Sequence, residues 1–363
     1  MFSLPIPFLT AALSAVMLVR ISAASVGNGR FRFWLALLFA AIMLQATLVG
    51  LRFGYGFDGA ILVQRVLPLS VGPLAYLAFR SLVAEGGGGG SREAVRHLGP
   101  ALVAAAAGFA IPPPYPAVDI LIAASFAFYI ALLARLWRRG PAAFEAVPFG
   151  SEGEARNWLA AVIAAMAVVG ITDVAIAADF TVYGGRHAAS IIGVISLGAV
   201  GLLLVAAMLF PRSGGRPVAA VPADAPGDRP APEDVAEPSS DAPSPPDAEE
   251  TALLAALDAV MRERRLYRDA DLTLARLARR LGVPARRLST AINRRHGMSV
   301  SLYVNALRVE EAAEALAGSD RAVGDIMAEA GFRTKSNFNR AFQERHGMSP
   351  TAYRAARRGA PAG

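Results

Sequence analysis

The run Ala330–Arg354, AGFRTKSNFNRAFQERHGMSPTAYR, decides the fold of the C-terminal part of this chain. Before it, 323–330 has the apolar spacing of a short helix. Gly331 with Phe332 then supplies a tight turn, and Lys335–His346 has the pattern of a second helix. A short helix, a glycine turn and a second helix form a helix-turn-helix unit, so this stretch predicts one.

A second copy of the pattern lies upstream in the chain. Thr273–Leu281 reads as a helix, Gly282-Val283-Pro284 interrupts it, and Ala285–His296 reads as a new helix. Seven residue pairs match at an offset of 50, namely Leu288/Phe338, Ile292/Phe342, His296/His346, Gly297/Gly347, Met298/Met348, Ser299/Ser349 and Tyr303/Tyr353. We expect one long helix over 300–316 between the copies. The four apolar residues of the first two pairs are spaced by four and should face a core.

The run 330–354 resembles the signature of the AraC-type transcription regulators: Gly-Phe, then Ser/Thr-x-Ser-x-Phe-x-Arg-x-Phe, then Gly-x-Ser-Pro-x-x-Tyr-Arg. Thr334 stands where serine is common in that family, and Met327 stands where a small alanine is usual. Residues 272–316 resemble the first module of the family. The resemblance implies a double helix-turn-helix, DNA-binding domain over 250–363. It does not reach residues 1–250, so the family's ligand chemistry is not implied.

The recognition helix of such a unit enters the major groove with its N-terminal part toward the bases. In the first unit this geometry places Arg286, Arg287, Ser289, Thr290 and Asn293 toward the DNA. In the second unit it places Lys335, Ser336, Asn337 and Arg340 there. Arginine can bind guanine O6 and N7, and asparagine can bind adenine N6 and N7. The resemblance singles out Arg286, Ser289, Thr290, Ser336, Asn337 and Arg340 as base-facing. The neighbouring Arg279, Arg280, Arg294, Arg295, Arg333 and Arg345 are better suited to phosphate or solvent.

Charge and hydropathy divide the chain into three parts. The hydrophobic fraction is 54% and the mean hydropathy is +0.42, yet the net charge is +7. Residues 1–210 hold the long apolar runs, whereas 251–358 hold 20 basic against 11 acidic residues. Residues 211–250 hold 3 basic against 9 acidic residues. The proline-, alanine- and acid-rich stretch 211–249 is predicted to be a disordered linker.

The residue types needed for catalysis or metal binding are scarce. The chain has no cysteine, which excludes disulfides, thiolate metal sites and cysteine nucleophiles, and it has four histidines without an HExxH pattern. We therefore predict no catalytic residue, no metal site and no cofactor, and we do not expect an enzyme.

Seven apolar segments are candidates for membrane spans: 3–19, 33–51, 60–79, 98–111, 117–134, 158–178 and 188–210. Six to eight spans would also fit. The sequence thus predicts an all-α fold, a seven-helix transmembrane bundle (1–210) followed by a cytoplasmic domain with two helix-turn-helix modules.

Arginines follow alternate predicted spans and give an orientation. They cluster after the first, third, fifth and seventh spans, whereas the other loops contain little beyond Arg52 and Arg186. By the positive-inside rule the N-terminus lies outside and the C-terminal domain lies in the cytoplasm, at the inner membrane of a bacterium. An alternative is that the first span is a cleaved signal peptide, since small residues follow it at 22–25.

Three polar residues fall inside predicted spans at a similar depth. Gln45, Arg65 and Asp173 each lie five or six residues from the outer end of their segment, roughly 8–9 Å below the boundary. They form a candidate signal-sensing cluster. In the alternative interpretation, Arg65 extends to the membrane surface and Gln45 bonds to a neighbouring helix.

Together these patterns predict a membrane-anchored, sequence-specific transcription regulator that couples a membrane or extracytoplasmic signal to promoter binding. The expected partners are double-stranded DNA and the lipid bilayer. RNA polymerase and a second copy of the chain are further candidates, and the ligand is unidentified. The alternative is a membrane receptor or transporter whose helix-turn-helix domain serves as a protein-interaction module. A third hypothesis is release of the C-terminal domain by cleavage in the linker.

Overall fold

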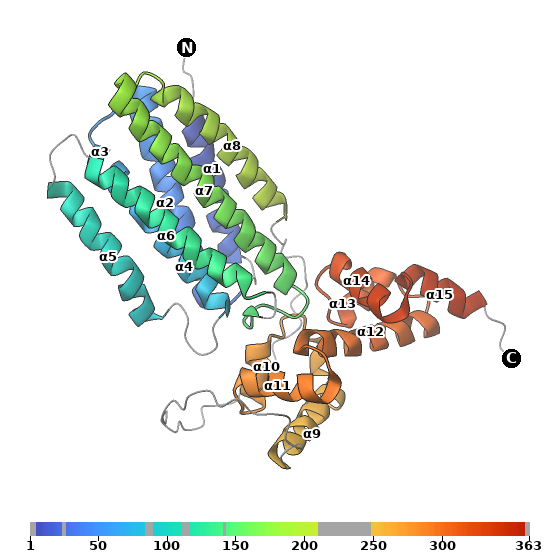
Figure 1. The fold of residues 1–363 in the computed structure, drawn as a ribbon. Coiled ribbons are helices and arrows are strands. Elements are labelled where there is room, and N and C mark those ends of the chain that lie inside the picture. The colour runs from blue at the N-terminus through green and yellow to red at the C-terminus, as the bar shows by residue number, and fades with distance from the viewer. Residues whose placement is uncertain are drawn as a thin grey trace.

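The computed structural model describes residues 5–23, 27–83, 90–110, 116–140, 143–209 and 248–359, and within these ranges the regular elements are helices (Figure 1). The predicted all-α class is therefore confirmed for the described part of the chain. The predicted linker 211–249 lies outside the described residues except for its last two, which begin a helix.

The N-terminal half consists mostly of long helices that run side by side, with one short helix, α3 (Ile61–Val66), among them (Figure 1). They are α1 (Ile6–Ala23), α2 (Gly29–Tyr55), α3 (Ile61–Val66), α4 (Pro68–Val83), α5 (Ser91–Ala110), α6 (Pro116–Arg138), α7 (Glu152–Tyr183) and α8 (Ala188–Leu209). Each predicted span coincides with helical residues. The third is divided into α3 and α4 at Leu67, next to Pro68, whose nitrogen cannot donate a helical hydrogen bond.

Three helices in the described residues are long and apolar enough to cross a membrane, judged by length and composition: Gly29–Tyr55, Ala117–Arg138 and Glu152–Tyr183. Two shorter apolar helical segments, Ile6–Ser22 and Ala188–Leu204, accompany them. The long apolar helices agree with the predicted membrane domain, and the full count of seven spans remains a proposal.

Six of these helices form a ring. α2 packs against α1 and α4, α4 packs against α6, and α6 packs against α7. α7 contacts α8, and α8 packs against α1, which closes the ring. α5 lies outside it against α3 and α4. The core of the bundle includes Leu77, Phe126 and Leu133, all nearly or fully buried.

The C-terminal half is built of shorter helices and has two separate hydrophobic cores. The elements are α9 (Ala248–Arg262), the 3₁₀ turn η2 (Leu266–Arg268), α10 (Leu274–Arg280), α11 (Ala285–His296), α12 (Val300–Gly318), α13 (Val323–Glu329), α14 (Lys335–His346) and α15 (Pro350–Gly359). Both predicted helix-turn-helix units and the connecting helix are confirmed. Leu288, Ile292, Phe338 and Phe342 are each 0% exposed, so the prediction that they face the core is also confirmed.

Candidate DNA-binding surface and its docking loop

The two units share the same local construction. Thr273 and Thr334 cap the N-termini of α10 and α14, since each side chain accepts a hydrogen bond from a main-chain N–H three residues on. Gly331 turns with φ +92°, and a Cβ there would lie 2.7 Å from the carbonyl oxygen of Tyr267. The second turn thus needs glycine both for its backbone angle and for the close approach of η2.

The predicted base-facing residues of the first unit lie on the surface of α11. Arg286, Arg287, Thr290 and Asn293 are exposed and Ser289 is half-buried. In the second unit, Lys335, Ser336 and Arg340 are exposed. Asn337 differs, because its side chain is only 8% exposed. The Arg340 guanidinium donates a hydrogen bond to Asn337 Oδ1 at 3.2 Å.

A histidine and a tyrosine stack at the end of each recognition helix. His296 and Tyr303 have ring centroids 5.1 Å apart, and His346 and Tyr353 have theirs 4.8 Å apart. The sequence duplication is therefore also a duplication of packing. Burial, with Arg345 and Arg357 nearby, lowers the pKa of His346 below its usual range.

Acidic residues at the start of α9 pair with the first recognition helix. Glu249 forms an ion pair with Arg287, and Glu250 lies 3.4 Å from Arg294. At the other end of α9, the Tyr303 hydroxyl donates a hydrogen bond to Asp258 at 2.9 Å, and burial with this bond raises the tyrosine's pKa. Helix α9 thus occupies two arginines that would otherwise be available to phosphate.

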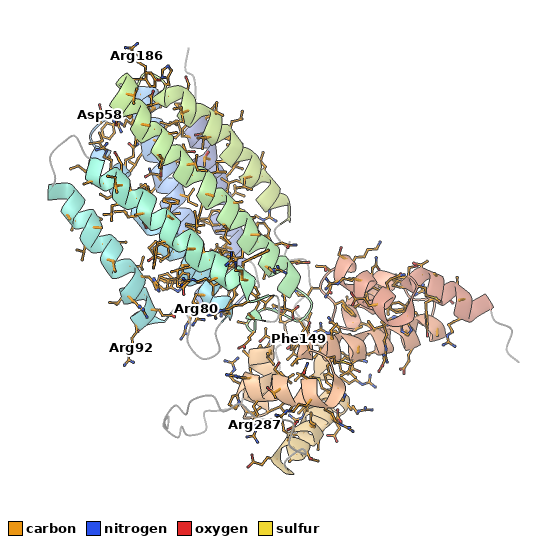
Figure 2. All side chains as sticks on the ribbon, in the orientation of Figure 1. Asp58, Arg80, Arg92, Phe149, Arg186 and Arg287 are labelled. Carbon is orange, nitrogen blue, oxygen red and sulfur yellow. The ribbon has the colours of Figure 1, made fainter. Side chains whose placement is uncertain are left out.

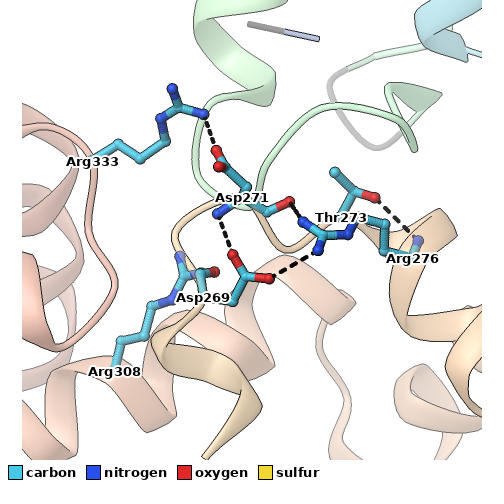
Figure 3. Close-up of polar contacts among 6 residues, drawn as sticks. All are labelled: Asp269, Asp271, Thr273, Arg276, Arg308 and Arg333. Carbon is cyan, nitrogen blue, oxygen red and sulfur yellow. Dashed lines mark hydrogen bonds and ion pairs between the residues drawn. The ribbon is translucent and has the colours of Figure 1, made fainter. Parts of the chain in front are cut away.

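A polar network joins the two units (Figure 3). Arg333, in the second turn, donates to Asp271 Oδ1 at 2.6 Å, and Arg276 lies 3.2 Å from Asp269 Oδ2. The Asp271 main-chain N–H donates to Asp269 Oδ1 at 2.9 Å. Because these residues come from the segment before α10, from α10 itself and from the turn before α14, the network fixes the units relative to each other.

The connection between α6 and α7 contacts both halves of the molecule. We call residues 144–151 the docking loop. Phe144 is 1% exposed in the core of the helix bundle, whereas Phe149 is 4% exposed in the core of the first helix-turn-helix unit. Figure 2 shows Phe149 between the bundle and this unit. The Phe149 N–H donates to the Leu272 carbonyl at 3.1 Å, and the Ala275 N–H donates to the Glu145 carbonyl at 3.3 Å. Burial of a phenylalanine side chain contributes about 2–3 kcal/mol, so each anchor is substantial.

Arg308, in the middle of α12, is 1% exposed and helps to hold this loop. Its guanidinium donates to the carbonyl oxygens of Tyr267 at 2.6 Å, Asp269 at 2.9 Å and Phe149 at 3.4 Å. Burial lowers the pKa of Arg308 to about 10, and the charges of Asp269 and Glu152 partly offset that effect. The arginine therefore stays protonated at neutral pH and ties the loop to the DNA-binding half.

The docking loop also covers the second recognition helix. Gly150, with φ +87°, packs so closely on Asn337 that a Cβ at this glycine would overlap with the amide. This contact contributes to the burial of Asn337. While the docking loop is bound to the DNA-binding half, which we call the docked conformation, Asn337 cannot contact a base. Its role in base recognition therefore stays a prediction for a conformation in which the loop is released.

Neither the docking loop nor Arg308 was predicted from the sequence. Three apolar side chains, at positions 144, 147 and 149, in a loop assigned to the cytoplasm were an available signal. Their partners lie far along the chain, so spacing alone could not identify them.

The three residues of the candidate sensing cluster line one cavity inside the ring of helices, together with Asp119 at the start of α6. The cavity volume is about 640 Å³. Gln45 Oε1 and Asp173 Oδ2 are buried there without a hydrogen-bond partner among the described residues. Asp119 interacts electrostatically with both Arg65 and Asp173.

The described C-terminal helices thus form a double helix-turn-helix domain. A family model described as "Helix-turn-helix domain" matches residues 277–356. Residues 248–359 thus contain a helix-turn-helix domain, in agreement with the resemblance to the AraC-type regulators.

Three transcriptional regulators or activators each match a quarter of this chain or less. It is 36% identical over 90 residues to the uncharacterized HTH-type transcriptional regulator YtdP of Bacillus subtilis, covering 25% of this chain and 12% of the relative. It is 35% identical over 86 residues to the transcriptional activator NphR of a Rhodococcus species (24% and 25%). It is 39% identical over 70 residues to the HTH-type transcriptional activator RhaR of Pectobacterium carotovorum (19% and 25%). The chain spans a quarter or less of the length of these relatives. All three relatives are named as transcriptional regulators or activators.

Proposed function

We propose that the chain is a membrane-anchored, sequence-specific DNA-binding transcription regulator that couples a membrane or extracytoplasmic signal to promoter binding. One observation carries the proposal: two helix-turn-helix units with exposed recognition residues stand next to a bundle of long apolar helices. Seven spans, with the N-terminus outside and the helix-turn-helix domain in the cytoplasm, complete the proposed topology.

The placement of charged residues along the bundle supports this topology. Arg80 and Arg92 lie at the end of the bundle near the helix-turn-helix domain, whereas Asp58 and Arg186 lie at the opposite end (Figure 2). The end near the DNA-binding half is thus the one with the arginine-rich loops, as the positive-inside rule requires of a cytoplasmic face.

We propose that the docking loop transmits the signal. In the docked conformation the first recognition helix remains exposed and the second is covered at Asn337. Reading a two-part site needs both helices, so the docked form is the weaker DNA binder. A signal that favours release of Phe149 and Gly150 from the DNA-binding half would raise occupancy of the promoter.

Chromatin immunoprecipitation of the tagged full-length protein tests the proposal. We expect discrete peaks that share a two-part motif, and we expect Arg340→Ala to weaken specific binding by about 1–3 kcal/mol. Arg264→Ala is the matched control, because Arg264 is an exposed arginine between α9 and η2 and lies outside both recognition helices. Absence of peaks, with the protein intact in the membrane, would overturn the proposed function.

The second candidate function is a membrane receptor or transporter with a helix-turn-helix interaction module. The contact that favours it is the docking loop itself, a peptide segment held by the helix-turn-helix domain. In that case Arg340→Ala would leave binding of the partner protein unchanged, and substitution of Phe149 would abolish that binding.

A further inference from the structure

The ring of six helices encloses a cavity whose shape is long and narrow. Residues of α2 from Phe31 to Phe53 line it, and that stretch of helix is about 33 Å long. The volume of about 640 Å³ lies in the usual range of small-molecule sites and is spread over this length. An extended, unbranched molecule fits such a space better than a compact one.

Most of the lining is apolar, and one group of polar side chains lies in its outer half. Gln45 and Asp173 each lie ten residues before the end of their helix, about 15 Å from those ends. Thr10 of α1 lines the cavity as well. Below this level the lining includes Leu38, Phe126 and Met166, which offer no hydrogen bonds to a ligand. Polar residues line the cavity again at its inner end, among them Ser151, Glu154 and Thr334.

The polar groups indicate the chemistry of the ligand's head. Gln45 Oε1 and Asp173 Oδ2 are acceptors without a partner, and the Thr10 hydroxyl also lacks one. A buried acceptor without a donor costs about 1–3 kcal/mol, so a donor that reaches these atoms binds favourably. Near the outer end, the carboxylates of Asp119 and Asp173 outnumber the guanidinium of Arg65, because Arg52, which also lines the cavity, is paired with Asp58. This balance of charge disfavours an anionic head.

We propose that this cavity binds a long-chain amphiphile whose head group donates hydrogen bonds, a protonated amine or a hydroxyl, to Asp173 and Gln45. The apolar chain then runs along the ring toward the cytoplasmic end. This inference gives the ligand class for the proposed sensing cluster, and so rests on the proposed function for its regulatory meaning. The binding itself does not depend on DNA.

The inner end of the cavity meets the docking loop. Pro148 and Ser151 of the loop line it, together with Thr334, the capping residue of α14. A chain long enough to reach this end contacts the loop and the second recognition helix at once. Binding in the cavity is therefore coupled to docking through direct contact.

Trp158 provides the readout, because it lines the inner half of the cavity fifteen residues before Asp173, about 22 Å along α7. Full-length protein with Trp34→Phe and Trp137→Phe retains this tryptophan alone. In nanodiscs without DNA, it is titrated with octadecylamine, octadecanol and octadecanoate, each brominated near the chain end. We expect saturable quenching of Trp158 by the amine and the alcohol and weak quenching by the carboxylate.

Variants separate head-group recognition from general partition into the bilayer. Asp173→Leu with Gln45→Met removes both acceptors at similar size and should weaken binding of the amine by about tenfold or more. Thr181→Val, on the exposed side of α7, is the matched control and should leave it unchanged. Ala165→Phe, which fills the cavity, should abolish quenching by all three probes.

Three results would overturn the proposal: equal binding of the carboxylate, full binding by the doubly substituted protein, or equal quenching by brominated phosphatidylcholine alone. Chromatin immunoprecipitation of the same variants keeps the two proposals apart. Loss of amphiphile binding with intact promoter peaks refutes the ligand and leaves the transcription function in place.

Discussion

The main-chain N–H of Phe149 donates a hydrogen bond to the carbonyl oxygen of Leu272. This bond joins the connection between α6 and α7 to the segment between η2 and α10. The N–H of Ala146 in the same connection donates to the carbonyl oxygen of Leu82 at the end of α4. The docking loop is thus bonded on one side to the bundle and on the other to the DNA-binding half. Its stability should set how readily the two halves separate.

Substitution of Gly150 should favour release. Gly150→Ala places a β-carbon against Asn337 at a φ of +87° and should cost the docked form about 1–2 kcal/mol. We expect up to about tenfold tighter binding to a two-part DNA site, measured by fluorescence anisotropy in nanodiscs. Gly153→Ala is the control, since a Cβ there meets no atom within 4 Å. Equal affinities of the two variants would contradict the role of the docking loop.

Removal of the Arg308 guanidinium should loosen α12 and the loop together. Arg308→Met leaves the carbonyl oxygens of Tyr267, Asp269 and Phe149 without this donor and should destabilise the domain by about 3 kcal/mol. Hydrogen exchange of α12 and of the docking loop measures the effect. Arg295→Met, at an exposed position of α11, should leave exchange unchanged.

Neutralising the start of α9 should strengthen DNA binding. Glu249→Gln with Glu250→Gln frees Arg287 and Arg294 for phosphate. Because exposed ion pairs contribute less than about 1 kcal/mol each, we expect about fivefold tighter binding at low salt. Glu263→Gln, an exposed position just beyond α9, is the control. An unchanged or weaker affinity would show that α9 does not compete with DNA.

The second helix-turn-helix unit should lose stability in mild acid. The pKa of His346 is lowered in the folded chain, chiefly by burial, so the unfolded chain takes up a proton at a higher pH. The free energy of unfolding should therefore fall as pH decreases through about 6.5 and toward the lowered pKa. Hydrogen exchange of α14 against pH measures it. His346→Gln should flatten this dependence, and His296→Gln, at the corresponding position of the first unit, should preserve it.

Introduced cysteines can map the proposed topology, because the chain has none of its own. Asp58→Cys should react with a membrane-impermeant maleimide on intact spheroplasts. Arg92→Cys, at the opposite end of the bundle, should react only after lysis. The reverse pattern would invert the orientation and exclude a cytoplasmic DNA-binding half.

Local patterns predicted the elements of the fold well. The helices of both units follow from spacing of apolar residues, from Thr273 and Thr334 as caps, and from Gly282 and Gly331 as turns, all of which act within a few residues. The burial of Phe338 and Phe342 follows from the same spacing.

The docking of the two halves could not be predicted in this way. Arg308 reaches the carbonyl oxygen of Phe149 across 159 residues, and no periodicity links the two positions. Asn337 shows the consequence: its place in the helix predicts a base reader, whereas a distant glycine covers it. The depth of Gln45, Arg65 and Asp173 in their predicted spans singled them out, and their sensing role stays a prediction. Depth did not single out Asp119, which lines the same cavity, because it lies near a helix start where acids are common.

The bundle and the DNA-binding half belong to one chain, which continues from α8 to α9. If the DNA-binding half is released from the docking loop, it therefore stays covalently attached to its own bundle. Re-docking is then a unimolecular event, so its equilibrium does not depend on the concentration of the protein. The fraction of molecules in the released form is therefore independent of how many copies a cell makes. Promoter occupancy, in contrast, rises with copy number, so expression level sets the amplitude of the response while its threshold stays fixed.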